Sequence, residues 1–306
     1  MSNNTNNTAK SVPSGYESRP DARAVLIGIG LIVLNGAMWA ASDTAAQFLT
    51  RTLPPIEVTW IRYAIHVLIL FPWLRGGLRG AFHTVHFRYQ VLRGVFAALS
   101  AITFIIGLNI IPVADATSVT FVAPFVIMGL AFWILNEKVE IIRWVAAAVG
   151  LTGVLIIVQP GSDAFRWSAL LPLLAAILGA AAIITTRLMP HDDSKVTMVY
   201  TGFVGLIVLS FLLPFYWVMP TGQGLLVGFA VGAFGAAANV ISIIVYRRLP
   251  ASLLAPFSYS QLVWASLFGF AVFGVWPTVS TLTGAFIIAA SGLYSAWREQ
   301  RMASTK

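Results

Sequence analysis

Two opposite charges stand inside apolar stretches that are long enough to cross a membrane. Asp43 lies eight residues before Arg51, and Arg62 lies seven residues after Pro55. The end of the first stretch and the start of the second lie on the same side of the membrane. At ~1.5 Å rise per helical residue, both charges therefore lie about 10 Å deep from that side. A lone charge in hydrocarbon costs about 3 kcal/mol on insertion scales, so each needs a partner or a wet cavity. We therefore expect Asp43 and Arg62 to pair, either as a lock between helices or in gating or substrate contact.

The other ionisable groups of these stretches are few. His66 follows Arg62 by one helical turn and shares its face. It can contact a substrate or relay a proton, or it can simply hydrogen-bond a neighbouring helix. Glu57 and Asp115 lie near the ends of their stretches, where a solvated or helix-capping carboxylate is expected. These two, Asp43 and His66 are the candidate groups for accepting a coupling proton.

Aromatic and amide side chains deep in the apolar stretches suit a planar or amphipathic solute. Gln261 and Trp264 are three residues apart and therefore lie on one helix face, whereas Tyr259 points to a different sector. Rings can stack on a flat ligand and amides can orient it, although the same residues can also serve only in helix packing. The candidate substrate-binding residues are Tyr259, Gln261, Trp264, Asn239, Phe104, Phe121 and His66.

Several kinds of chemistry have no residues to support them. The chain has no cysteine, which excludes disulfides, zinc-thiolate sites and iron–sulfur clusters. It has no Gly-x-Ser-x-Gly, no His/Glu pair at helical spacing and no Gly-rich phosphate loop with Lys. We predict no catalytic residue, metal or cofactor. A membrane-embedded enzyme remains one alternative, and a channel remains another, although neither charge rings nor a carbonyl filter is visible.

The composition explains what positions these residues. Of 306 residues, 58% are hydrophobic and 10% charged, against roughly a quarter charged in soluble domains. Ten apolar runs follow each other, and each is about the length that a membrane helix needs. We predict an all-α membrane protein with ten transmembrane helices, at residues 24–48, 55–74, 90–110, 113–135, 142–159, 167–187, 196–218, 223–246, 251–275 and 279–297.

The basic residues orient this arrangement. With both termini inside, sixteen of the 19 Lys and Arg residues fall in cytoplasmic segments, Arg51 and Arg166 fall outside, and Arg62 lies within a span. This asymmetry predicts a multi-pass protein of the cell inner (plasma) membrane with both termini cytoplasmic. The net charge of +8 then faces anionic lipid, so the lipid bilayer is a predicted partner and nucleic acid is not.

The two halves of the chain resemble each other weakly. Pro112 matches Pro250 and Phe132 matches Phe270 at one offset. Because each half has five spans, the second copy would be inverted, which is typical of secondary transporters with a midplane substrate site. We expect that site between spans three, four, eight and nine. The predicted organisation is a disordered cytoplasmic tail at 1–22, repeats at 23–160 and 161–298, and a cytoplasmic tail at 299–306.

The run from Ile111 to Pro124, IPVADATSVTFVAP, followed by Leu135-Asn136-Glu137 and Gly150 to Gly153, resembles the drug/metabolite transporter superfamily. More narrowly, it is similar to the ten-span EamA-type permeases, although Val275 stands where that family usually has Glu. The resemblance covers residues ~24–297.

The resemblance implies two inverted five-helix repeats and a secondary transporter that works by alternating access across the inner membrane. The implied substrate is a small organic metabolite, such as an amino acid, a flavin or an S-adenosylmethionine-like compound. Protons are a candidate coupling ion, and the protein is expected to be a monomer or a homodimer. Substrate identity and the direction of transport are left open.

Overall fold

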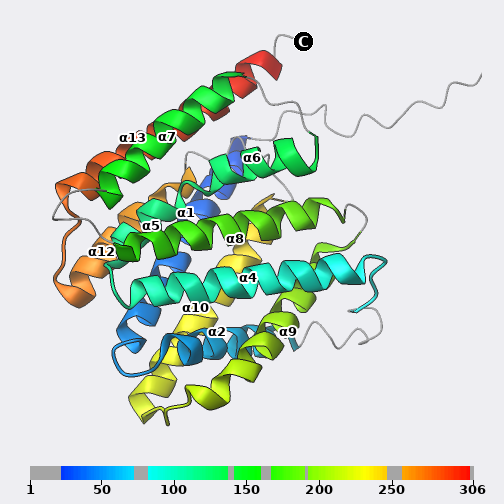
Figure 1. The fold of residues 1–306 in the computed structure, drawn as a ribbon, viewed down its shortest axis with the longest axis vertical. Helices are drawn as coiled ribbons and strands as arrows, with labels where there is room; N and C mark the ends of the chain where they lie inside the picture. The colour runs from blue at the N-terminus through cyan, green and yellow to red at the C-terminus, as the bar shows by residue number, and fades with distance from the viewer. Residues whose placement is uncertain are drawn as a thin grey trace, which may run out of the picture.

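The computed structural model describes residues 22–71, 82–136, 141–159, 167–189, 192–246 and 257–303, and every regular element in these ranges is helical (Figure 1). The elements are α1 (Ala22–Leu49), α2 (Pro55–Leu70), α4 (Phe87–Leu108), α5 (Val113–Thr120), α6 (Ala123–Ile134), α7 (Ile141–Val158), η2 (Trp167–Ala169), α8 (Leu170–Arg187), α9 (Ser194–Leu212), η3 (Leu213–Phe215), α10 (Gly222–Tyr246), α12 (Ser260–Phe273) and α13 (Val279–Ala303).

The helices have the length and surface of a membrane protein. In the described ranges, six apolar helical segments of 21 to 25 residues are long enough to span a bilayer, and shorter apolar helices accompany them. Large apolar side chains point outward, among them Trp133 at 77% and Phe286 at 74% exposure. Such exposure suits lipid and not water. The all-helical membrane architecture expected from composition is therefore observed.

Some expectations lie outside the described ranges. Among them are residues 1–21 and 304–306 of the expected tails, residues 72–74 and 251–256 of two expected spans, and Glu137, Arg166 and Pro250. At the other end, α13 continues to Ala303, so the expected tail at 299–306 begins as helix.

The stretch expected as one span at 113–135 is broken into α5 and α6. The break follows from Pro124, which stands at the start of α6 and has no N–H to donate to the carbonyl of Thr120 one turn earlier. Backbone that leaves the helical pattern at membrane depth is tolerated where it lines a cavity. Thr120 and Pro124 both line the central cavity described below.

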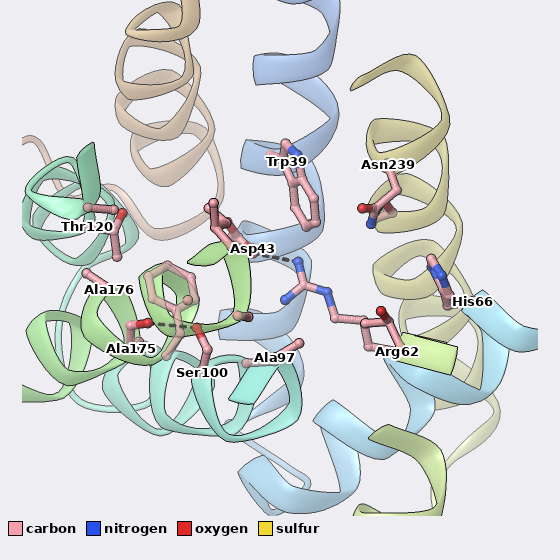
Figure 2. A pocket seen from close by; sticks show the side chains of 18 of the residues that line it. Trp39, Asp43, Arg62, His66, Ala97, Ser100, Thr120, Ala175, Ala176 and Asn239 are labelled. Carbon is pink, nitrogen blue, oxygen red and sulfur yellow. Dashed lines mark hydrogen bonds and ion pairs between the residues drawn. The ribbon is translucent and has the colours of Figure 1, made fainter. Parts of the chain in front are cut away.

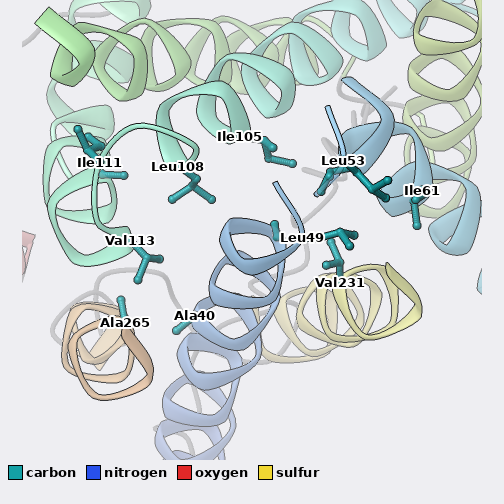
Figure 3. Packing of buried hydrophobic residues seen from close by; sticks show 13 residues of the cluster. Ala40, Leu49, Leu53, Ile61, Ile105, Leu108, Ile111, Val113, Val231 and Ala265 are labelled. Atoms are coloured by element: carbon teal, nitrogen blue, oxygen red, sulfur yellow. The ribbon is translucent and has the colours of Figure 1, made fainter. Parts of the chain in front are cut away.

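A cluster of buried apolar side chains, here called the apolar plug, fills one end of the bundle (Figure 3). It lies where α1 ends, α2 begins and α4 passes into α5. Gln47 fixes this corner, because its amide donates to the carbonyls of Leu108 and Ile111 and accepts from the N–H of Val113. The plug consists of Ala40, Ala46, Leu49, Leu53, Val58, Ile61, Ile105, Leu108, Ile111, Val113, Ala116, Val231 and Ala265.

Polar contacts tie the opposite end together around Asp192, which precedes α9. Its carboxylate accepts hydrogen bonds from the hydroxyl of Thr84 and, at 2.8 Å, from the amide of Gln90, and His86 Nδ1 lies 3.5 Å away. Burial alone would raise the pKa of Asp192, but these hydrogen bonds outweigh it and hold the pKa below its usual value. The carboxylate therefore stays ionised and joins the start of α4 to the start of α9.

Helices α7 and α13 lie side by side (Figure 1) and approach closely at two glycines. A Cβ built on Gly284 would lie 2.5 Å from the carbonyl oxygen of Gly153. We expect Gly284→Ala to lower the unfolding temperature, because backbone cannot yield as a flexible side chain can. Gly129→Ala is the matched control, since nothing lies within 4 Å of its new Cβ. It should raise stability by about 1 kcal/mol through helix propensity. Equal shifts of the two melting curves would contradict the close contact.

Candidate functional site

A central cavity of about 550 Å³ is lined by described residues of nine helices, α1, α2, α4, α5, α6, α8, α9, α10 and α12 (Figure 2). Its volume lies within the roughly 300–1,000 Å³ of ligand sites. Small residues of α4, α8 and α10 create the space. The wall includes Trp39, Asp43, Arg62, Tyr63, His66, Arg93, Ala97, Ser100, Ala101, Phe104, Thr120, Phe121, Ala123, Pro124, Ala175, Ala176, Gly179, Ala182, Ile183, Met198, Thr201, Gly232, Gly235, Ala236, Asn239 and Gln261.

The cavity and the apolar plug follow each other along the same helices. On α2, Ile61 belongs to the plug and Arg62 to the cavity wall, and on α4 the wall ends at Phe104 where the plug begins at Ile105. On both helices, the step toward the end where α1 stops leads from wall to plug. The plug therefore closes the cavity at that end.

The expected ion pair between α1 and α2 is present. An Arg62 NH2 group lies 2.9 Å from Asp43 Oδ1, and both side chains are largely buried (Figure 2). The same nitrogen donates to Ser42 Oγ at 3.1 Å, and the guanidinium lies 5.2 Å from the centre of the Trp39 ring. Gly235 leaves space for the Arg62 guanidinium, since a Cβ at this position would lie 3.3 Å from Arg62 Nε. Salt bridge, hydrogen bond and ring together hold the charge in one position.

Three further predicted residues lie in the same wall. His66 follows Arg62 on α2, and the absence of a side chain at Gly202 leaves room for its ring. Asn239 on α10 donates to the carbonyl of Gly235, one turn earlier in its own helix. Gln261 lies in the first turn of α12. The two amides and the imidazole thus reach one cavity from three helices.

The predicted aromatic residues separate into two groups. Phe104 and Phe121 line the cavity. Tyr259 is absent from the described lining, and its ring packs against Phe121 with centroids 5.1 Å apart. Trp264 is also absent from the described lining, since its ring stacks on Phe268 at 5.6 Å and packs against the apolar plug. The expected common face of Gln261 and Trp264 therefore spans two environments, cavity and plug.

Arg93 is a wall residue that the sequence reasoning assigned to a cytoplasmic segment. It lies in the second turn of α4, where Nε donates to Thr186 Oγ1 at 2.7 Å and one terminal nitrogen donates to Thr201 Oγ1. The spacing of Arg93, Ala97, Ser100 and Phe104 is that of a single helix stripe. That spacing is the signal that could have placed Arg93 in the cavity.

Glu57 and Asp115 lie in the first turns of α2 and α5, as expected, but the expectation that they are solvated is wrong, because both are buried. Glu57 is fully buried and accepts a hydrogen bond from the N–H of Val218 at 3.0 Å. Asp115 is also buried and accepts from the Thr281 hydroxyl at 2.7 Å. Tertiary contacts with the segment before α10 and with α13 cover both helix starts. Their role is to hold neighbouring segments, outside the cavity wall.

The wall suits binding more than bond-breaking chemistry. Within the described ranges, no three His, Asp or Glu side chains gather as a metal site would require. The cavity instead combines aromatic rings, neutral amides and fixed cations. Such a surface can hold and release an organic solute.

Comparisons with known proteins agree with this geometry. The profile of the EamA-like transporter family matches residues 26–159. An S-adenosylmethionine uptake transporter of Rickettsia felis is 28% identical, with 93% of this chain and 97% of that protein covered. A riboflavin transporter of Rhizobium johnstonii is 30% identical, with 92% and 94% covered. A solved crystal structure, 19% identical, matches with a TM-score of 0.62 over 92% of this chain and 99% of its own.

Proposed function

The chain belongs to the EamA-like transporter family and is a small-metabolite transporter, not an enzyme, and from that premise we propose that its substrate binds in the central cavity. The observation that carries this proposal is the cavity itself. It lies among helices from both halves of the chain and holds the buried Asp43–Arg62 pair. Buried charges inside a membrane bundle mark substrate or ion pathways by default.

We further propose two inverted five-helix repeats, at 23–160 and 161–298, making ten spans. Helix packing supports this proposal. When α1, α2, α4, α5–α6 and α7 are exchanged with α8, α9, α10, α12 and α13, most of the extensive helix–helix contacts are preserved, although α2–α4 has no such counterpart in α9–α10. The α1–α10 contact becomes α8–α4, α1–α12 becomes α8–α6, and α2–α10 becomes α9–α4. The pairs α7–α13, α2–α9 and α5–α12 map onto themselves. An odd number of helices per repeat then inverts the second copy.

The apolar plug gives alternating access a physical form. The plug blocks one end of the cavity. A solute can therefore cross only if the helices that form the plug separate while the other end of the cavity closes. The positive-inside asymmetry supports an orientation in the inner membrane with the plug end outside and both termini in the cytoplasm. In this proposed orientation, the end of the cavity away from the plug faces the cytoplasm. Proton coupling, with Asp43 or His66 as carrier, and a monomer or homodimer remain predictions.

The substrate we propose is a planar heteroaromatic metabolite. The relatives are named for S-adenosylmethionine and riboflavin, and both of these molecules carry a flat nitrogen heterocycle. Phe104 and Phe121 offer ring faces, and Gln261 and Asn239 offer amides that can pair with ring nitrogens and carbonyls.

Filling the cavity should stop transport while the fold persists. Ala97 and Leu99 are two residues apart on α4, the first in the cavity wall and the second exposed at the lipid-facing surface. Wild-type protein in liposomes is first tested for uptake of labelled S-adenosylmethionine, riboflavin and amino acids, with and without a pH gradient. We expect Ala97→Trp to abolish uptake of whichever of these solutes the wild-type protein carries. Leu99→Trp, the matched control, should retain uptake. Unimpaired uptake by Ala97→Trp at normal reconstitution would refute the cavity as the substrate path.

A further inference from the structure

We propose that Arg93 is the anion-binding group of the cavity, and that the transported solute therefore carries a carboxylate. This inference rests on the proposed function of the cavity as a substrate site. It narrows the proposed substrate from planar heterocycles in general to those that also carry a carboxylate, because a flat heterocycle alone does not require a charge. The geometry around Arg93, and the charges that surround the cavity, carry it.

The protein positions the Arg93 guanidinium without neutralising it. Thr186 on α8 and Thr201 on α9 accept its two hydrogen bonds. Each hydroxyl donates its own proton to a carbonyl one turn earlier in its helix, at 2.9 Å for Thr186 and 2.6 Å for Thr201. Their lone pairs are thereby directed at the guanidinium. Within the described ranges, no carboxylate lies within 4.0 Å of Arg93.

The charges of the described wall do not balance. Asp43 is its one carboxylate, and Arg62 already holds that group at 2.9 Å. His66 adds no negative charge in either protonation state. The wall therefore carries at least one excess positive charge, and a cation taken from water needs a counter-ion nearby. A bound solute with a single carboxylate supplies that charge.

The remaining donors of Arg93 fit a carboxylate in particular. A guanidinium has five N–H groups in a planar fork, and two of them serve the threonines. The free N–H groups can hold both oxygens of a carboxylate side by side. From Arg93 the wall stripe runs along α4 to Phe104, eleven residues or about 16 Å further. A carboxylate at one end and a flat ring at the other span that distance in an extended solute.

The test compares probes that differ only in charge. Indole-3-acetate and indole-3-acetamide share a ring and a shape, and they are shorter than the stripe, so they report on the Arg93 end alone. They are titrated against the purified full-length protein, with thermal unfolding and calorimetry as readouts. We expect wild-type protein to bind the acetate at least about tenfold more tightly than the amide. Equal affinities, including no binding of either at millimolar concentration, would overturn the proposal.

Variants identify the responsible charge. Arg93→Gln should remove the preference for the acetate and leave binding of the amide unchanged, while Arg93→Lys should keep part of the preference. Arg88→Gln, on the exposed face of the same helix, removes an equal charge outside the cavity and should change nothing. The unfolding temperature of Arg93→Gln without probe should not fall, because the substitution removes a partly buried charge that has no described carboxylate partner. A lower unfolding temperature with equal losses for both probes would assign Arg93 to packing and refute the proposal.

The two proposals fail separately. If Ala97→Trp blocks uptake but the acetate gains nothing over the amide, the cavity remains the substrate path and the carboxylate subsite falls. If the acetate is preferred through Arg93 and Ala97→Trp still transports normally, the anion subsite stands and the cavity is not the transport path.

Discussion

Asp43→Asn is expected to unfold the detergent-solubilised protein at a markedly lower temperature and to abolish its uptake activity. The substitution leaves Arg62 with Ser42 and the Trp39 ring as its partners in the cavity wall. Removing one member of a buried ion pair costs about 3–5 kcal/mol, because the survivor is an uncompensated charge in a low-dielectric site. Arg62→Gln should have a comparable effect, since it strands the Asp43 carboxylate.

The double variant Asp43→Asn/Arg62→Gln should be more stable than either single variant. With both charges gone, the neutral amides can hydrogen-bond across the same gap between α1 and α2, so the two losses are far from additive. The measurement is a double-mutant cycle on the unfolding temperature, with Arg88→Gln as the control for loss of an exposed charge. Additive losses would mean that the 2.9 Å contact contributes no coupling.

Transport by the double variant separates the two roles considered for the pair. A lock between helices predicts that the double variant regains uptake together with stability. A part in gating or substrate contact predicts that stability returns and uptake does not. We expect the second result, because the guanidinium forms part of the cavity wall itself.

The sequence was sufficient for the all-helical membrane character of the fold and for this pair. Apolar runs of membrane length predict helices whatever their neighbours are, since the backbone in lipid must satisfy its own hydrogen bonds. The depth of Asp43 and Arg62 followed from counting residues inward from one end of each helix. The pairing itself followed from the cost of an isolated charge.

The positions of single side chains around the helices were harder to predict. Gln261 and Trp264 share a face by spacing, yet the boundary between cavity and plug passes between them. Glu57 and Asp115 occupy first turns that normally face water, but segments distant in the chain cover them. Arg93 belongs to the cavity because Thr186 and Thr201 come from other helices. Each case depends on which neighbour packs on which side.

The broken span illustrates how local chemistry and the site are connected. Pro124 was visible in the sequence, yet only the tertiary arrangement shows that the interruption faces the cavity. Thr120 and Phe121 thereby reach the wall from non-continuous helix. Half-helices of this kind are the usual means by which transporters bring polar backbone to a midplane site.

The chain's lack of cysteine makes it possible to measure which side the cavity faces. Any introduced cysteine is the only thiol in the protein, so labelling with a membrane-impermeant maleimide reports that position alone. Ala97→Cys places the thiol in the cavity wall, and Ala116→Cys places it in the apolar plug, where the native residue has no exposed surface. Leu99→Cys, on the lipid-facing side of α4, is the control for reagent that partitions into the bilayer.

We expect the Ala97→Cys thiol to react at least about tenfold faster in inside-out than in right-side-out vesicles, because in the proposed orientation the plug separates the cavity from the outer face. Ala116→Cys should resist reagent from both faces in the absence of substrate. A transported solute should then accelerate its labelling from the outer face, since alternating access requires the plug to open during each cycle. Rapid reaction of Ala97→Cys from both faces at rest would instead indicate a continuous pore. In that case the channel alternative would replace the alternating-access mechanism.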